Sequence, residues 1–174
     1  MGLRYLWIES PVGPLRLVGG AAGLAAVLWE NQDPTESGLE LECEDARDPV
    51  LVQAARELQE YFAGERREFS VPLDFTGTEF QNKVWRALRS IPFGETRSYG
   101  ELAAQIGAPK ASRAVGAANG RNPIPIILPC HRVIGSSGSL TGFGGGLPMK
   151  KQLLAHEQVR SQLALELGSN GPGH

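Results

Sequence analysis

A cysteine and a histidine, Cys130 and His131, stand side by side in a chain that contains only two cysteines and three histidines. An apolar run over residues 124–128 precedes the pair, and a glycine-rich segment over residues 135–146 follows it. We interpret the run as a buried strand that ends at the thiol, so that Cys130 would be a nucleophile on a rigid support beneath a flexible cover. Free cysteines are also commonly buried and inert, so a structural Cys130 beside a surface His131 is the alternative.

A nucleophilic thiol needs a base, and the base needs a group that orients it. Neighbouring side chains on a strand point to opposite faces, so contact between Cys130 and His131 requires either a bent backbone or a bridging water. The proline before the pair and the glycine after it favour such a bend. His156 and Glu157, on the last predicted helix, are the candidate orienting groups. One interpretation is therefore a Cys-His-Glu relay, and the other is an exposed helix carboxylate at Glu157.

Helices are the main elements that must position these residues. Capping-box patterns at residues 78–81 and 98–101 each precede a helical stretch. Apolar spacing and glycine or proline breaks predict helices over residues 78–91, 102–106, about 111–118 and 147–159. The second and third are joined by a tight Gly-Ala-Pro turn, which predicts a helix-turn-helix.

The third of these helices is unusual because nearly all of its side chains are small, at Ala111, Ala114, Gly116, Ala117 and Ala118. Its single long side chain is Arg113. Such a helix lets its backbone approach another surface closely, and one arginine projecting from it can enter a groove or replace an extruded base. Close packing of this helix inside the protein is the alternative.

The first half of the chain predicts a small α/β domain. Apolar segments separated by turn residues predict an antiparallel meander over residues 3–8, 15–18 and 24–29. Residues 31–47 are polar and acidic and are expected to form a loop. A helix is expected to begin at Asp48-Pro49 and to end at Gly64, before a short edge strand at residues 71–75. The predicted domains are residues 1–76 and 77–160, followed by a disordered tail over residues 161–174.

Charge is divided unevenly between these halves, although the net charge of the chain is only −2. Residues 1–76 hold six Lys or Arg against fourteen Asp or Glu, whereas residues 77–160 hold eleven against four. The basic half also contains the Cys-His pair. We therefore expect the second domain to meet a polyanion and the acidic first domain to serve as a scaffold, with two unrelated solvated surfaces as the alternative.

Other function classes find little support in the sequence. No apolar run approaches the roughly 20 residues that span a bilayer, and the N-terminus lacks a signal-peptide pattern. Cys43 and Cys130 stand in different contexts, so we expect no disulfide and a reducing, cytoplasmic setting. No Cys/His spacing resembles a zinc site, and no metal is expected.

In combination, these segments resemble the O6-alkylguanine-DNA alkyltransferase family, the methylated-DNA–protein-cysteine methyltransferases. The resemblance is strong over residues 78–157, whereas the N-terminal half resembles the family only in its general character. It is carried by residues 78–91, Ser98-Tyr99-Gly100-Glu101-Leu102-Ala103, Ser112-Arg113-Ala114-Val115-Gly116, Gly120-Arg121-Asn122-Pro123, Pro129-Cys130-His131-Arg132-Val133 and Leu153-Leu154-Ala155-His156-Glu157.

The resemblance implies a ribonuclease H-like α/β domain followed by a helical, winged helix-turn-helix-like domain. It implies repair of DNA by direct transfer of the alkyl group from guanine O6, and more weakly from thymine O4, to Cys130. The thioether product is stable, so each molecule would act once, without cofactor or metal. The implied partner is double-stranded DNA bound through its minor groove without regard to sequence, by a monomer that extrudes the damaged base.

The resemblance also assigns roles to single residues. Cys130 would be the nucleophile, His131 would take its proton through a water, and Glu157 would orient His131. Asn122 would hold the loop that frames the site, and Tyr99 would donate a hydrogen bond to the leaving guanine. DNA would be contacted by Arg113, which fills the gap in the duplex, and by Ala114, Gly116, Ala117, Tyr99 and Arg121. The base pocket would be lined by Gly142, Phe143, Gly144 and Gly145.

Two positions depart from the family pattern, since relatives often have Tyr at Phe143 and Ser or Ala at Gly144. Their loss of a hydroxyl and a side chain is expected to change the pocket, either in width or in preferred alkyl group. A related class replaces the nucleophile by Trp and only flags lesions, but this chain keeps Cys130. A non-catalytic lesion-binding protein and a thiol hydrolase built on the same relay are the alternative functions.

Overall fold

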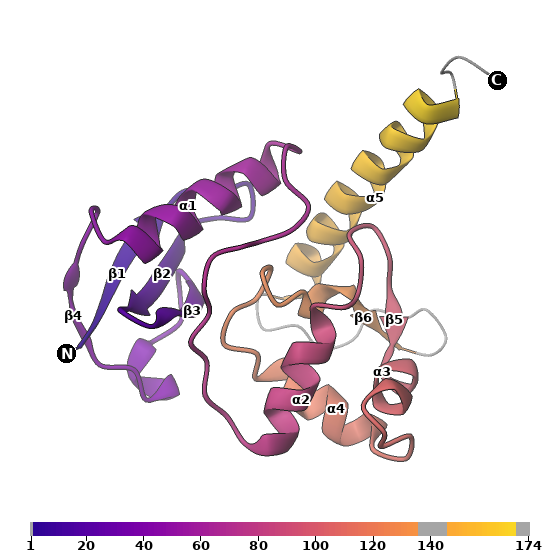
Figure 1. Ribbon diagram of the computed structural model, residues 1–174, viewed down its shortest axis with the longest axis horizontal. Coiled ribbons are helices and arrows are strands. Elements are labelled where there is room, and N and C mark those ends of the chain that lie inside the picture. Colours follow the sequence, from indigo (N-terminus) through magenta and orange to yellow (C-terminus); the bar gives the residue numbers. More distant parts are fainter. Residues whose placement is uncertain (1, 136–145, 170–174) are drawn as a thin grey trace. The chain divides into compact units, whose positions relative to one another are not determined.

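The computed structural model describes the backbone of residues 2–135 and 146–169, and the side chains of that part as far as Gln158 (Figure 1). The chain divides into two compact units. The first contains Met1–Glu79 together with Asn122–Leu128, and the second contains Phe80–Arg121 together with Pro129–His174. The sequence placed the segment 122–128 in the second domain. In the structure it groups with the first unit, where Val27 N donates a hydrogen bond to Pro123 O at 2.9 Å.

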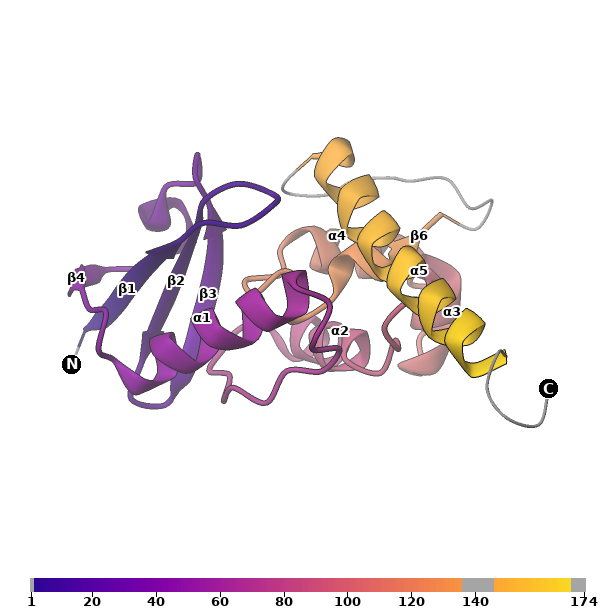
Figure 2. The ribbon, with the colours of Figure 1, turned by 90° about the horizontal axis from the view of Figure 1, so that it is seen from above.

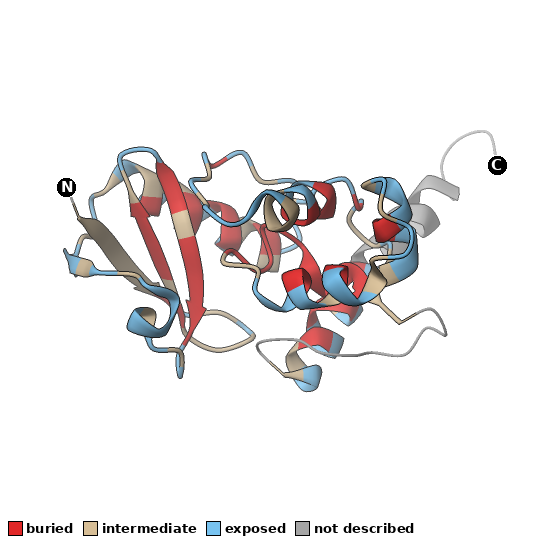
Figure 3. Cartoon of the chain, turned by 90° about the horizontal axis from the view of Figure 1, so that it is seen from below, coloured by how far each residue is buried: buried red, intermediate tan, exposed pale blue. Residues whose placement is uncertain are grey.

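The first unit is built on a four-stranded mixed sheet in the order β3-β2-β1-β4. The strands are β1 (Leu3–Ile8), β2 (Leu15–Gly20), β3 (Gly23–Trp29) and β4 (Leu41–Glu44). The first three form the antiparallel meander that the sequence predicts. Figure 3 shows β2 and β3 as mostly buried, in keeping with their apolar sequences.

The predicted loop over residues 31–47 is wrong in two places. A short 3-10 turn, η1 (Pro34–Ser37), follows the Asp33 cap, and β4 pairs in parallel with β1. The strand is short and largely exposed, so its own sequence carries no alternating apolar signal. Its pairing is supported from β1, where Arg4 forms an ion pair with Asp45 at 2.7 Å.

Helix α1 (Pro49–Phe62) lies along one face of this sheet (Figure 2). It begins as predicted, because the Asp48 carboxylate accepts hydrogen bonds from Val50 N and Leu51 N. Its buried side packs toward the inner residues of β2 and β3. The core between helix and sheet consists of fully buried apolar side chains, among them Leu15, Leu17, Leu24, Leu51 and Leu58.

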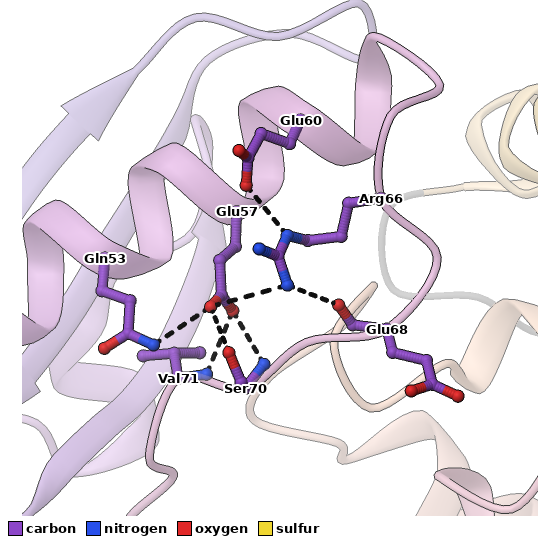
Figure 4. Close-up of polar contacts among 7 residues, drawn as sticks. All are labelled: Gln53, Glu57, Glu60, Arg66, Glu68, Ser70 and Val71. Carbon is purple, nitrogen blue, oxygen red and sulfur yellow. Dashed lines mark hydrogen bonds and ion pairs between the residues drawn. The ribbon is translucent and has the colours of Figure 1, made fainter.

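A buried carboxylate joins α1 to the segment that follows it (Figure 4). Glu57 is fully buried and accepts hydrogen bonds from Ser70 N at 2.9 Å, Val71 N at 3.0 Å, Ser70 Oγ at 2.7 Å and Gln53 Nε2 at 3.0 Å. Arg66 approaches it at 3.8 Å. Burial acts to raise the pKa of Glu57, but these hydrogen bonds outweigh it and hold the pKa below its ordinary value.

Replacing this carboxylate is expected to destabilise the protein by about 2–4 kcal/mol, because the Glu57→Gln amide would turn donors toward the backbone N–H groups of Ser70 and Val71. Chemical denaturation of the full chain measures the change. The matched control is Glu60→Gln on the same helix, where a partly exposed ion pair with Arg66 is worth less than about 1 kcal/mol. Equal losses for the two variants would contradict a special role for Glu57.

The predicted edge strand at residues 71–75 is reduced to one bridge between Leu24 and Leu73. Leu24 N donates to Pro72 O, and Asp74 N donates to Leu24 O, both at 2.8 Å. Pro72 has no N–H to extend a ladder, so pairing stops there.

The second unit is mainly helical. It contains α2 (Glu79–Leu88), α3 (Tyr99–Gln105), α4 (Ser112–Gly120) and α5 (Leu147–Ser169), with η2 (Cys130–Arg132) as a single 3-10 turn. Two short strands that the sequence did not predict, β5 (Arg97–Ser98) and β6 (Val133–Ile134), pair in parallel. The α3 and α4 helices pack against each other as the predicted helix-turn-helix requires. The capping box of α3 is complete, with Ser98 and Glu101 each bonded to the other's backbone.

Helix α5 is longer than predicted. It continues to Ser169, where the sequence prediction ended it at residue 159 and placed a disordered tail from residue 161. Residues 161–167 contain good helix formers and no proline or glycine, which explains the continuation. In the described part of the chain, no helix has the length and apolar character needed to cross a membrane.

Candidate active site at Cys130

The segment that leads to Cys130 is not the buried strand that its composition predicted. Residues 124–128 are buried, but they form a turn closed by Leu128 N donating to Ile124 O at 2.9 Å. Ile126 has a φ of 76°, which strand geometry does not allow. The prolines at 123 and 125 lack the N–H groups that a ladder needs, so an apolar turn replaces the strand.

The side chain of Asn122 closes this turn by bonding to backbone groups at both of its ends. Its amide nitrogen donates to Leu128 O at 2.6 Å, and its amide oxygen accepts from Ile124 N at 2.9 Å. The residue therefore holds the loop that precedes Cys130, which is the place that the sequence resemblance expected for it.

The backbone bends at Cys130 itself. Cys130, His131 and Arg132 form the 3-10 turn η2, in which Val133 N donates to Cys130 O. The alternation of side chains along a strand therefore does not apply to Cys130 and His131. Both side chains are buried, the thiol at 5% and the imidazole at 0% exposure.

His131 and Glu157 are in direct contact. The His131 Nε2 atom lies 2.7 Å from Glu157 Oε2, and neither side chain is exposed by more than 1%. Glu157 is therefore not an exposed helix carboxylate. The contact is satisfied by a neutral imidazole with its proton on Nε2, which leaves Nδ1 as a base. That Nδ1 atom is buried and has no hydrogen-bond partner among the described residues.

Arg132 holds the same carboxylate from a second side. Its Nε lies 2.8 Å from Glu157 Oε1, and its Nη2 lies 3.0 Å from Glu157 Oε2. Its Nη1 donates to Ile91 O at 2.6 Å, so the guanidinium also connects the turn to the segment that follows α2. This role of Arg132 was not predicted from the sequence, although the residue belongs to the segment Pro129-Cys130-His131-Arg132-Val133.

These contacts set the charge of the site. Burial acts to raise the pKa of Glu157. The hydrogen bond from His131 and the guanidinium of Arg132 outweigh burial and hold that pKa far below its ordinary value, so the carboxylate stays ionised. Burial lowers the pKa of His131, against the opposing effect of Glu157. The imidazole is thus held neutral near pH 7, in the state that can accept a proton.

Two further polar residues of the site, Asn119 and Lys150, were not predicted from the sequence. Asn119 Nδ2 donates to Cys130 O at 3.3 Å, and Lys150 Nζ donates to Val133 O at 2.6 Å. Lys150 is fully buried. A signal was present in the sequence, because Lys150 stands seven residues before Glu157, on the helix face that carries the buried Leu153 and Leu154.

The residues expected to contact DNA lie mainly on α4. Arg113, Ala114 and Ala117 are exposed, whereas Val115 and Ala118 are buried on the opposite side of the helix. Arg121, just after α4, is also exposed. Gly116 faces Tyr99 at the start of α3, since a methyl group at Gly116 would lie 3.8 Å from the Tyr99 ring. The expected base-pocket residues lie outside the described part of the chain, at Gly142, Phe143, Gly144 and Gly145.

Family comparisons divide the chain into the same two kinds of domain. Residues 79–159 match the model of the 6-O-methylguanine DNA methyltransferase, DNA binding domain, and residues 3–75 match the model of its ribonuclease-like domain. A methylated-DNA–protein-cysteine methyltransferase of Mycolicibacterium paratuberculosis is 51% identical over 95% of this chain and 98% of its own length. A constitutive protein of that name from Bacillus subtilis is 46% identical over 89% of this chain and 95% of its own length.

Solved structures agree with this assignment. The crystal structure of Mycobacterium tuberculosis OGT in complex with DNA has a TM-score of 0.83 and 51% identity, and the match covers 90% of this chain and 94% of that one. An O6-methylguanine DNA methyltransferase from Methanococcus jannaschii has a TM-score of 0.64 and 28% identity, over 88% of this chain and 93% of its own. The chain belongs to the methylated-DNA–protein-cysteine methyltransferase family.

Proposed function

We propose that this chain repairs DNA by moving the alkyl group of O6-alkylguanine irreversibly onto Cys130. The observation that carries the proposal is the buried imidazole of His131 next to Cys130, fixed at 2.7 Å by a carboxylate that is itself held by Arg132. A neutral, oriented base beside a thiol is what nucleophilic attack by sulfur needs. A reducing compartment such as the cytoplasm keeps that thiol available.

Each step follows from the placement of these groups. The Cys130 thiol loses its proton through a water to His131 Nδ1, and the sulfur attacks the alkyl carbon. The carbon–O6 bond breaks, its electron pair stays with the guanine, and the guanine takes up one proton, which balances the proton that the thiol gave up. Tyr99 donates a hydrogen bond to the leaving guanine and so lowers the cost of the charge on it. The new carbon–sulfur bond is a stable thioether, so the protein acts once.

Helix α4 presents the surface suited to DNA. The small side chains of its exposed face, Ala114 and Ala117, allow the helix to enter the minor groove, and Arg113 projects from the same face. Arg113 takes the place of the extruded base in the duplex. Recognition of shape and backbone suits lesions that occur in any sequence.

Arg113→Ala is expected to slow transfer from duplex DNA by about tenfold or more, because the gap left by the extruded base is no longer filled. Reaction with free O6-benzylguanine, which has no duplex to open, should change little. The two rates are measured under single-turnover conditions. Lys110→Ala removes an exposed cation just before α4 and serves as the control. Equal slowing on both substrates would contradict the base-replacement role.

Stoichiometry tests the function itself. A duplex with one labelled O6-methylguanine is titrated with protein, and the methyl groups removed are counted. We expect removal to stop when each protein molecule has accepted a single methyl group. Continued turnover would exclude a single-use acceptor, and tight binding with the methyl group left on the DNA would fit the lesion-binding alternative.

A further inference from the structure

The side chain of Asn119 carries a buried oxygen that the proposed reaction does not use. Asn119 is only 3% exposed, and its Oδ1 atom has no hydrogen-bond partner among the described residues. A buried acceptor without a partner destabilises a folded protein, and native structures retain few of them. An acceptor in this state is suited to a donor that a bound molecule supplies.

The other end of the same amide fixes where this oxygen lies. Nδ2 of Asn119 donates to Cys130 O at 3.3 Å, and Cys130 O also accepts from Val133 N. Because two oxygens repel each other, the amide turns its nitrogen and not its oxygen toward Cys130 O. Oδ1 is bonded to the same carbon atom as Nδ2, so it lies beside the backbone of the nucleophile. A base whose alkyl carbon reaches the Cys130 sulfur therefore brings its edge close to this oxygen.

Asn119 also stands on the helix that the proposed function assigns to DNA. It lies near the end of α4, on the buried side of that helix, whereas Arg113 is exposed near its start (Figure 1). The two residues are six positions apart, which is about 9 Å along a helix. Trp85 Nε1 donates to Ala118 O at 2.8 Å and so holds this end of α4 in place. One rigid element thus carries both the arginine that replaces the extruded base and an acceptor beside the sulfur that the base must reach.

Alkylated bases differ in the donors that they offer to such an acceptor. Alkylation at O6 removes the proton from guanine N1, so the 2-amino group is the donor that remains on the pairing edge. Alkylation at O4 removes the proton from thymine N3 in the same way, and thymine has no amino group. A site that hydrogen-bonds one group of its substrate discriminates against an analogue without that group. An acceptor beside Cys130 therefore favours alkylated guanine over alkylated thymine.

We propose that Asn119 determines the specificity of the site, because its Oδ1 accepts a hydrogen bond from the 2-amino group of the extruded O6-alkylguanine. The inference rests on the proposed function and deepens it by naming the group through which the site recognises its substrate. Nδ2 keeps its bond to Cys130 O, so one amide connects the base to the nucleophile. The contact is absent for alkylated thymine, which gives a physical reason for the weaker transfer from thymine O4 that the family resemblance implies.

The test removes the amino group from the DNA and the amide from the protein, separately and together. Two duplexes of one sequence carry either O6-methylguanine or O6-methylhypoxanthine, which lacks the 2-amino group. Single-turnover transfer to the full chain is measured on both. Asn119→Leu removes the amide at similar volume, and Asn119→Ala is the second variant in case leucine prevents folding. Gln105→Leu is the matched control, because it removes an exposed amide that donates to Ser90 Oγ at 2.8 Å.

We expect the parent to react faster with the guanine duplex than with the hypoxanthine duplex. Asn119→Leu and Asn119→Ala should lower the ratio of these two rates by about fivefold or more, which is the effect of one hydrogen bond. Loss of the bond to Cys130 O slows both reactions alike and cancels in the ratio. Gln105→Leu should keep the parent ratio. An unchanged ratio in the Asn119 variants would overturn the proposal, even where both rates fall, since equal slowing indicates a structural role.

Failure of this contact and failure of the repair function give different results. If the parent transfers the methyl group of guanine and the ratio is unchanged in the variants, the repair function stands and the contact fails. If the parent transfers nothing from either duplex, the repair function fails. The contact is then decided by the affinities for the two duplexes in chains that carry Cys130→Ala. A preference for guanine that Asn119→Leu abolishes would support the contact, and a preference that Asn119→Leu leaves unchanged would exclude it.

Discussion

Cys130→Ala is expected to abolish alkyl transfer from DNA while keeping the affinity for the duplex. The sulfur forms the new bond to the alkyl carbon in the proposed reaction, and alanine has no nucleophile to replace it. The exposed face of α4 lies on a separate element and is unaffected by removal of a buried thiol. Binding is measured with a fluorescent duplex that contains O6-methylguanine, and transfer is measured by loss of the methyl group from the same duplex.

Cys43→Ala is the matched control for this experiment, because Cys43 is exposed on β4 in the first unit. It should transfer the methyl group at the parent rate. Transfer at the parent rate by Cys130→Ala would refute the assignment of the nucleophile. Loss of both transfer and binding would mean that Cys130 is a structural residue.

Glu157→Gln is expected to damage both stability and reaction. Arg132 would be left as a buried charge without its carboxylate, and breaking a buried pair in this way costs about 3–5 kcal/mol. His131 would lose the acceptor that fixes its tautomer, so transfer should slow by about 10²–10⁴-fold. Chemical denaturation and single-turnover kinetics measure the two effects. Glu95→Gln, which removes an exposed ion pair with Arg97, should change stability by less than about 1 kcal/mol.

The loss of unfolding free energy in Glu157→Gln depends on pH in a defined way. The pKa of Glu157 is lowered in the folded protein, so its contribution is fully present above the unfolded value of about 4.3. This contribution is lost as the pH falls below the unfolded pKa and then through the pKa of Glu157 in the folded protein. The difference between the parent and Glu157→Gln should therefore be constant from pH 7 to about pH 5 and shrink below about pH 4. A difference that vanished near pH 6 would assign the effect to another group.

Much of the fold was predictable because its signals are local. The meander of the first unit follows from short apolar segments between turns, and α1 and α3 begin at caps formed by Asp48 and Ser98. The relay partner Glu157 was predictable only as one of two alternatives. Spacing along a helix shows which face a residue shares, but not what packs on that face.

The remaining features depend on contacts between segments that are distant in the sequence. Strand β4 forms because it pairs with β1. Residues 124–128 form a buried turn that the side chain of Asn122 closes through its hydrogen bond to Leu128 O. Arg132 and Lys150 were missed because a charged side chain ordinarily indicates an exposed position. Arg132 binds the carboxylate of Glu157, and Lys150 binds the carbonyl of Val133, and both contacts form only when the chain is folded.

Mapping the methyl group to one peptide tests the central claim most directly. The protein is incubated with a duplex that carries a single labelled O6-methylguanine, then digested and analysed by mass spectrometry. We predict one methyl group per protein molecule, attached to the sulfur of Cys130, with unmodified guanine left in the DNA. A methyl group on any other residue, or none on the protein after the DNA is repaired, would contradict this account.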